Sequence, residues 1–219
     1  MMELKSNMSK NRVDIFKIVC FFARDCGIEA LKRLLNDKRF IIVRLLVHSK
    51  LPKSEDPNRG IRPEFPIFKE IADKHSIPIS IIDTREEAQN LTSLRTTGSF
   101  DFLISLSWRF LIPKDIFSKA KIAAINVHRG KLPTYAGAEP VKRALEKGEK
   151  YIVLTVHEMV EEIDAGKVLI EKYYPVKYDD SKSLIENVER LKKEILPLYP
   201  NAIIEAIETI TDMESYATK

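Results

Sequence analysis

The chain has 219 residues, of which 44% are hydrophobic and 31% are charged. This is the composition of an ordinary folded globular protein and excludes a chain that is disordered throughout. The net charge of +4 is too small to indicate nucleic acid by itself, and it suits an anionic small molecule equally well. The two cysteines, Cys20 and Cys26, form neither a disulfide framework nor a C-x-x-C pair, so we expect a reduced, cytoplasmic compartment.

The first thirteen residues are polar and charged and lack the apolar core of a signal peptide. No apolar run in the chain reaches the length that a bilayer-spanning helix needs. We therefore expect residues 1–13 to form a flexible extension and residues 14–219 to form a single domain.

The first half of the chain alternates strand and helix patterns. Residues 15–22 and 40–47 are apolar, β-branched runs typical of buried strands, and a helical pattern opens at Gly27 between them. Further helices are expected over residues 66–75, 86–96 and 113–120, and further strands over residues 79–82, 100–105 and 122–127. This order predicts a Rossmann-like α/β fold, an open and mostly parallel sheet with helices on both faces.

The pattern changes after residue 128. A loop over residues 128–137 leads to a helix over residues 140–147, with Pro140 in its first turn. Strands over residues 153–160 and 168–176 are close enough in the chain to pair antiparallel. An amphipathic helix is expected over residues 181–195 with Ser181 as its N-cap, and a last helix over residues 200–210.

Three polar residues are candidates for chemistry. Asn126 and His128 lie two apart at the end of a strand, so they point to one face. An amide and an imidazole placed there can both donate to one oxygen and stabilise negative charge on it. Taken alone, the same residues also fit a strand cap and a partner for loop backbone, and Asp164 alone fits ordinary turn chemistry.

Together, Asn126, His128, Leu132-Pro133, Gly137 and Asp164-Ala165-Gly166 resemble the signature of the formyltransferase family. This family includes glycinamide ribonucleotide formyltransferase, methionyl-tRNA formyltransferase and the sugar N-formyltransferases. The tract of residues 105–113 is similar to the family's folate-side segment, and the resemblance runs over residues 15–210. It implies the formyltransferase fold, catalysis by Asn126, His128 and Asp164, and 10-formyltetrahydrofolate as formyl donor, with no metal.

The resemblance also implies two loops that hold the folate ring. Their residues are Trp108, Arg109, Phe110, Leu111, Val160, Glu161, Glu162 and Ile163. For Trp108 and Phe110, packing in the core is an equally simple interpretation. We also hypothesise that Leu132-Pro133 is a cis peptide, because proline tolerates the cis form in tight functional turns.

The acceptor side departs from the family. Where glycinamide ribonucleotide formyltransferase has a Gly- and Ser-rich phosphate loop, this chain has Arg24 and a single Gly27, and Arg129 follows the histidine. The loop of residues 56–63 resembles the basic loop of the methionyl-tRNA and sugar enzymes and carries Arg59 and Arg62, which could grip phosphate. We expect all four arginines to bind substrate, although a solvated surface loop explains Arg59 and Arg62 equally well.

The expected partners are folate and a small amine, first of all a nucleotide-linked amino sugar or a similar phosphorylated amine. Glycinamide ribonucleotide is the alternative acceptor, and a non-catalytic Rossmann-like binding module is the alternative of another class. Neither a membrane nor a nucleic acid is expected as a partner, and a homodimer is left open.

Overall fold

The computed structural model describes residues 14–95 and 97–217, so the extension expected over residues 1–13 lies outside the described residues. Within them, seven strands form one sheet in the order β3-β2-β1-β4-β5-β6-β7. The strands are β1 (Phe16–Phe22), β2 (Phe40–Val47), β3 (Ile79–Ile81), β4 (Phe100–Leu106), β5 (Ala120–His128), β6 (Tyr151–Glu158) and β7 (Val168–Pro175). The expected open, mostly parallel sheet with an antiparallel pair near the C-terminus is confirmed.

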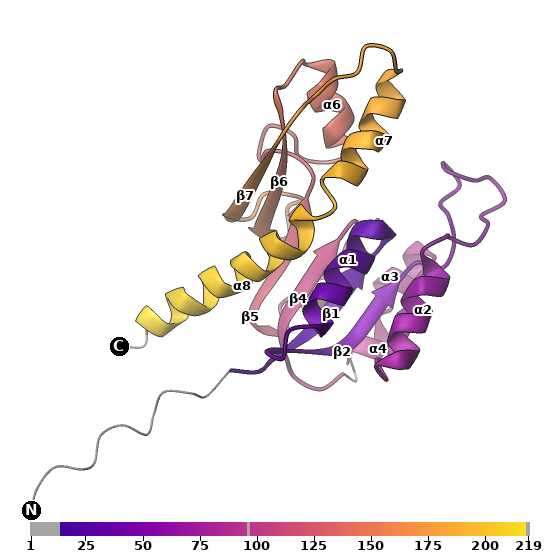
Figure 1. Ribbon diagram of the computed structural model, residues 1–219. Coiled ribbons are helices and arrows are strands. Elements are labelled where there is room, and N and C mark those ends of the chain that lie inside the picture. Colours follow the sequence, from indigo (N-terminus) through magenta and orange to yellow (C-terminus); the bar gives the residue numbers. More distant parts are fainter. Residues whose placement is uncertain (1–13, 96, 218–219) are drawn as a thin grey trace, which may run out of the picture.

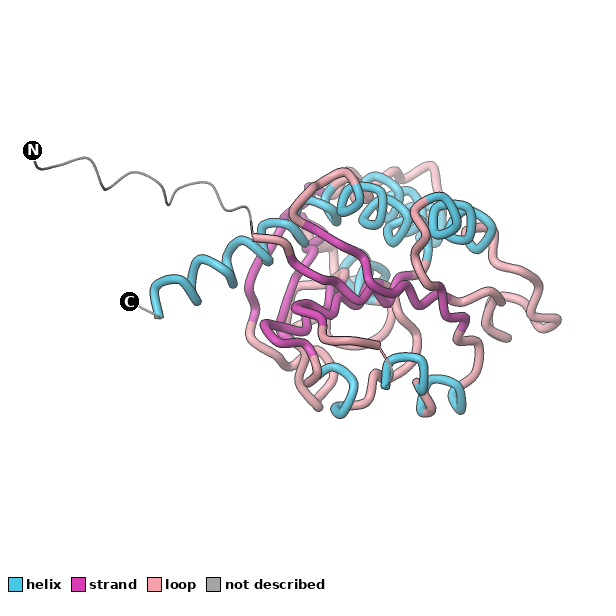
Figure 2. The backbone as a smooth tube through the Cα atoms, turned by 90° about the horizontal axis from the view of Figure 1, so that it is seen from below, coloured by secondary structure: helices cyan, strands magenta, loops and turns pink. Residues whose placement is uncertain are grey.

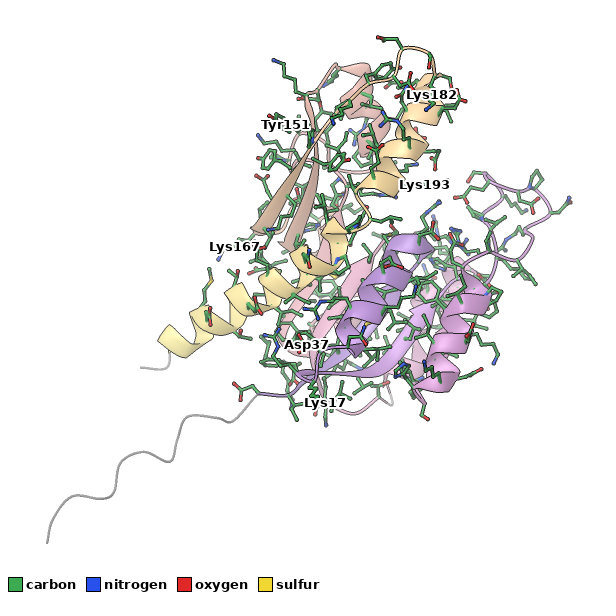
Figure 3. The ribbon with its side chains drawn as sticks, in the orientation of Figure 1. Lys17, Asp37, Tyr151, Lys167, Lys182 and Lys193 are labelled. Atoms are coloured by element: carbon green, nitrogen blue, oxygen red, sulfur yellow. The ribbon has the colours of Figure 1, made fainter. Side chains whose placement is uncertain are left out.

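The antiparallel part is larger than expected, because β6 pairs antiparallel with β5 as well as with β7. Asn126 lies opposite His157 in this pairing, and His128 lies opposite Thr155. In Figure 3, Tyr151 and Lys167 lie at opposite ends of the β6–β7 pair. This reversal brings the loop after β6 back to the end of β5.

Two hydrophobic clusters lie on the two faces of the sheet, because side chains alternate along each strand. On one face, Ile18 and Leu154 belong to the cluster that also contains residues of five helices. These are α1 (Arg24–Leu35), α2 (Phe65–Lys74), α6 (Pro140–Glu146), α7 (Leu184–Glu194) and α8 (Leu198–Ala217). On the other face, Val19 and Leu103 pack with residues of the shorter helices α3 (Arg85–Gln89), α4 (Thr92–Arg95) and α5 (Lys114–Phe117), or of their flanking loops.

The figures show this arrangement as three layers. Seen from below in Figure 2, the longer helices lie along one side of the sheet and the short helices along the other. Figure 1 places α6 and α7 beside β6 and β7, and the last turns of α8 extend away from the sheet. No helix in the described part of the chain combines the length and apolar character needed to cross a bilayer.

Several expected boundaries change. The weak helix expected over residues 86–96 is two short helices, α3 and α4, and its last residue lies outside the description. The final helix begins at Leu198 and continues to Ala217 rather than ending near residue 210. The hypothesis of a cis Leu132-Pro133 peptide is confirmed.

The expected N-cap of α7 is also corrected. Ser183, not Ser181, caps the helix through a capping box in which its hydroxyl accepts from Glu186 N and the Glu186 carboxylate accepts from Ser183 N. The Ser181 hydroxyl instead donates to Asp179, one turn outside the helix. Sequence alone offered two serines within three residues, and the presence of a glutamate three positions later distinguishes them.

We predict that Ser183→Ala lowers the free energy of unfolding by about 1 kcal/mol, because an N-terminal N–H of α7 loses its partner. Urea denaturation followed by circular dichroism measures the change. Ser181→Ala is the matched control and should cost only a few tenths of that amount, that is, about 0.3 kcal/mol. An equal or larger cost for Ser181→Ala contradicts the assignment of the cap.

Candidate active site

The carboxyl end of β5 carries Asn126 and His128 on the same face. Their neighbours Ile125 and Val127 belong to the hydrophobic cluster on the face that α1 and α8 cover. Asn126 and His128 therefore face the opposite side of the sheet, which carries α5. There they line a cleft of about 560 Å³. Open α/β sheets bind ligands at this end of their strands.

Asp164 reaches the same cleft from the loop between β6 and β7. Its Oδ1 lies 3.4 Å from Asn126 Nδ2, and its Oδ2 lies 3.3 Å from His128 Nδ1 and accepts a 2.8 Å hydrogen bond from Gly137 N. Gly166 allows the loop to turn back, because a Cβ there would lie 1.8 Å from the Glu158 carbonyl oxygen. The structure thus brings the three candidate side chains together.

His157 is a fourth member that sequence reasoning did not assign. It lies opposite Asn126 across β5 and β6 and is 3% exposed. Its Nδ1 donates to Glu158 O at 2.8 Å, and its Nε2 lies 3.1 Å from Asn126 Nδ2 and 3.4 Å from Asp164 Oδ1. Nε2 therefore accepts from Asn126 when the ring is neutral and donates to Asp164 when the ring is protonated.

The backbone around Tyr135 fixes which edge of His128 is available. His128 Nε2 lies 2.7 Å from the Tyr135 carbonyl oxygen, and a carbonyl can only accept, so Nε2 carries a hydrogen. Gly130 permits this contact, because a Cβ there would lie 3.0 Å from His128 Nε2 and 2.8 Å from the Tyr135 Cβ. The neutral His128 ring consequently turns a bare Nδ1 toward Asp164 and the cleft.

The surroundings of His128 and Asp164 favour the neutral form of the imidazole and the ionised form of the carboxylate. Burial lowers the pKa of His128 below its usual value, and the nearby Asp164 carboxylate only partly opposes this shift. For Asp164 burial acts in the raising direction, but the hydrogen bonds from His157 and Gly137 and the adjacent imidazoles outweigh it, so its pKa is lowered. At neutral pH the site therefore pairs an ionised carboxylate with a neutral imidazole that has one free basic nitrogen.

The cleft has an apolar wall made by the two expected folate loops. Trp108, Arg109, Phe110, Leu111, Val160, Glu161, Glu162 and Ile163 all line it. Leu111 and Ile163 are 70% and 60% exposed, so large apolar surfaces lie uncovered beside the catalytic candidates. A cleft of this size and character fits a flat, drug-sized ring.

For Trp108 and Phe110 the packing considered from the sequence is confirmed, and their contact with folate stays a prediction. They pack against the cluster beneath the short helices while lining the cleft. Trp108 stacks on His48 with ring centres 4.0 Å apart and meets Phe21 edge-on at 5.1 Å. Arg109 is held by backbone, since its guanidinium donates to the carbonyl oxygens of Lys50 and Asp83.

The four arginines expected on the acceptor side separate into two pairs. Arg24 and Arg129 line the cleft. Arg59 donates to the carbonyl oxygens of Leu51 and Asp83, and Arg62 is 4% exposed; neither is among the cleft-lining residues. Both have partners within or beside the loop, and their contact with a phosphate stays a prediction.

Metal chemistry was not expected from the sequence. Over residues 14–95 and 97–217, no group of three or more His, Cys, Asp and Glu side chains is arranged to hold a metal ion.

We predict that His128 titrates below pH 6.5, because burial disfavours its imidazolium. Asp164→Asn should lower the midpoint further, since the carboxylate charge that favours the imidazolium is lost. Side-chain NMR of ¹⁵N-histidine-labelled protein measures both midpoints. Asp37→Asn is the control, because Asp37 lies at the other end of the sheet (Figure 3); a midpoint that rises in Asp164→Asn contradicts the assigned contact.

The chain is similar in sequence to known proteins. A methionyl-tRNA formyltransferase from Thermotoga sp. (strain RQ2) is 27% identical over 194 residues, which cover 89% of this chain and 58% of that protein. One from Enterococcus faecalis is 35% identical over 120 residues, covering 54% of this chain and 38% of that protein. The chain thus spans less than two thirds of the length of these relatives.

Solved structures share the fold. A formyltetrahydrofolate deformylase from Pseudomonas syringae has a TM-score of 0.67 at 18% identity, covering 89% of this chain and 60% of that chain. A phosphoribosylglycinamide formyltransferase from Anaplasma phagocytophilum has a TM-score of 0.63 at 16% identity, covering 87% and 85%. A family model described as formyl transferase matches residues 17–203, and because this match spans most of the chain, the protein belongs to the formyl transferase family.

Proposed function

We propose that this chain transfers the formyl group of 10-formyltetrahydrofolate to a primary amine. The observation that carries the proposal is the convergence of Asn126, His128 and Asp164 on one cleft that also has an exposed apolar wall. The family membership and the names of the relatives support the same class of reaction.

The donor supplies an electrophilic formyl carbon, and the proton lost by the attacking amine balances the proton gained by the departing folate nitrogen. Asn126 donates its amide N–H toward the formyl oxygen, where negative charge develops. The 3.4 Å contact with Asp164 Oδ1 is long for a hydrogen bond, so a ligand oxygen can replace it at little cost.

His128 manages the proton. Its Nε2–H is committed to Tyr135, so only Nδ1 faces the cleft, and it is unprotonated in the neutral ring. Nδ1 accepts a proton from the amine, and Asp164 stabilises the imidazolium that results. The protonated Nδ1 can then donate to the departing nitrogen.

For the acceptor we propose an amine that carries a phosphate, because Arg24 and Arg129 line the cleft. A nucleotide-linked amino sugar is the first candidate and glycinamide ribonucleotide the second. Methionyl-tRNA completes the panel, since curated relatives are named for it. Release of tetrahydrofolate against this panel, with water as the acceptor in the blank, identifies the substrate and tests the proposal.

We predict that His128→Ala and Asp164→Asn each lower turnover about 100- to 1,000-fold, and that the double variant loses about as much as either single one. The reason is that the two residues hold one proton between them. The measurement is tetrahydrofolate release with the best acceptor. His75→Ala, an exposed histidine at the end of α2, is the control. Multiplicative losses in the double variant, or full turnover in Asp164→Asn, contradict the shared role.

We also predict that the protein binds 5-formyltetrahydrofolate, a stable analogue of the donor, and that Leu111→Asp weakens this binding about tenfold through lost apolar contact. Isothermal titration calorimetry measures both. Ile185→Asp is the matched control, because Ile185 is 68% exposed but lies on α7. Absence of binding at millimolar analogue favours a non-catalytic binding module.

A further inference from the structure

We propose that Glu55 holds Arg24, one of the two cations that line the cleft, in the free protein, and that an acceptor phosphate must displace it. Glu55 thereby acts as an internal competitor that lowers the affinity of the site for an anion that must displace it. The inference rests on the proposed function for the nature of the acceptor. Three observations are needed. Arg24 and Arg129 must both line the cleft, the Glu55 carboxylate must lie against one of them, and the ion pair must be weak enough for a ligand to replace it.

The two cations are Arg24 and Arg129. Arg24 begins α1 with a φ of 62°, a left-handed conformation that is unusual for a residue with a side chain. Arg129 directly follows His128, and it has no hydrogen-bond or ion-pair partner in the described part of the chain. Both side chains line the cleft.

Both arginines line the cleft, and their positive charges also act on two buried groups beside α1. Burial raises the pKa of the Cys26 thiol, and the positive charges of Arg129 and Arg24 both oppose that rise. The same two charges oppose the rise that burial causes in the pKa of the Tyr199 hydroxyl. Two cations that act on the same buried groups beside the first turn of a twelve-residue helix create a strongly positive place.

The loop of residues 49–63 delivers Glu55 to this place. Lys50 pairs with Ile61 across the base of the loop, and Asp56 Oδ2 accepts from Gly60 N at 2.7 Å. Arg59 ties the base to the Asp83 carbonyl oxygen at 2.7 Å. The anchored base leaves Glu55 near the tip of the loop, where its carboxylate accepts from Arg24.

The Arg24–Glu55 ion pair is weak enough to exchange. The two side chains are 40% and 35% exposed, and pairs with this exposure contribute little to stability. Glu55 has a second cation at hand, since Arg62 Nη1 lies 3.9 Å from its Oε2. When Arg24 is taken by a ligand, the Glu55 carboxylate therefore keeps a partner.

A phosphate has the advantage in this exchange. It offers up to two negative charges and three acceptor oxygens, so it can bridge Arg24 and the unpaired Arg129 at once. A carboxylate offers one charge, the same as Glu55, and gains only from Arg129. A phosphate therefore displaces Glu55 more readily than a carboxylate does, although Glu55 lowers the apparent affinity of both ligands by the same factor.

The test measures binding of inorganic pyrophosphate to the full chain by isothermal titration calorimetry at low salt. Glu55→Gln should bind about fivefold more tightly than the wild type, because the internal competitor has lost its charge. Glu205→Gln is the matched control, since Glu205 forms a comparably exposed ion pair with Lys172 on a different surface; it should leave the affinity unchanged. Arg129→Met should weaken binding in both the wild-type and the Glu55→Gln backgrounds.

Unchanged or weaker pyrophosphate binding in Glu55→Gln overturns the inference, and weaker binding would assign Glu55 to direct contact with the ligand. In a second assay, the KM for a phosphate-bearing amine should fall in Glu55→Gln, and an unchanged KM counts against the exchange. The calorimetry needs neither donor nor turnover. If the protein does not transfer formyl groups, the calorimetry still tests the displacement of Glu55. If Glu55 is not displaced, the proposed formyl transfer is not affected.

Discussion

The Asp164 carboxylate is the point at which separate parts of the chain meet. One oxygen accepts from the backbone N–H of Gly137 and faces His128, and the other faces Asn126 and His157. These partners come from β5, from β6 and from the loop that precedes α6. Because a carboxylate that is largely removed from water must be matched by donors, the position of each of these segments is constrained by the same two oxygen atoms.

The backbone around the cleft is held in conformations that most residues avoid. Arg24, Ser107, Glu139 and Asp164 all have φ values between 50° and 62°, and all four line the cleft. Each such conformation costs on the order of 1 kcal/mol. Arg24, Ser107 and Glu139 adjoin a strand or a helix, and the Asp164 carboxylate is held by the backbone N–H of Gly137. Four residues with unfavourable backbone conformations therefore line the cleft that contains the candidate catalytic side chains.

Much of the fold could be predicted because local patterns determine it. The apolar runs of β1 and β2 and the helical pattern between them can be read from the sequence. The trio was identified by its resemblance to the formyltransferase signature, because the spacing of Asn126 and His128 alone fits an ordinary strand end equally well. What could not be predicted depends on pairing between distant segments. His157 acquires its place only because β6 runs antiparallel to β5, and no local pattern reports which neighbour a strand chooses.

The arginines illustrate the same limit in electrostatic terms. From the sequence, Arg24, Arg59, Arg62 and Arg129 carry equal charges and equal capacity to bind phosphate. In the folded chain the Arg59 guanidinium donates to carbonyl oxygens, and Arg62 is buried beside Glu64. Arg24 and Arg129, in contrast, line the cleft. A guanidinium is available to a ligand only when the fold leaves it a replaceable partner or none. The fold thus divides four equivalent charges into two that have partners in the loop and two that line the cleft, and the same loop places Glu55 against Arg24.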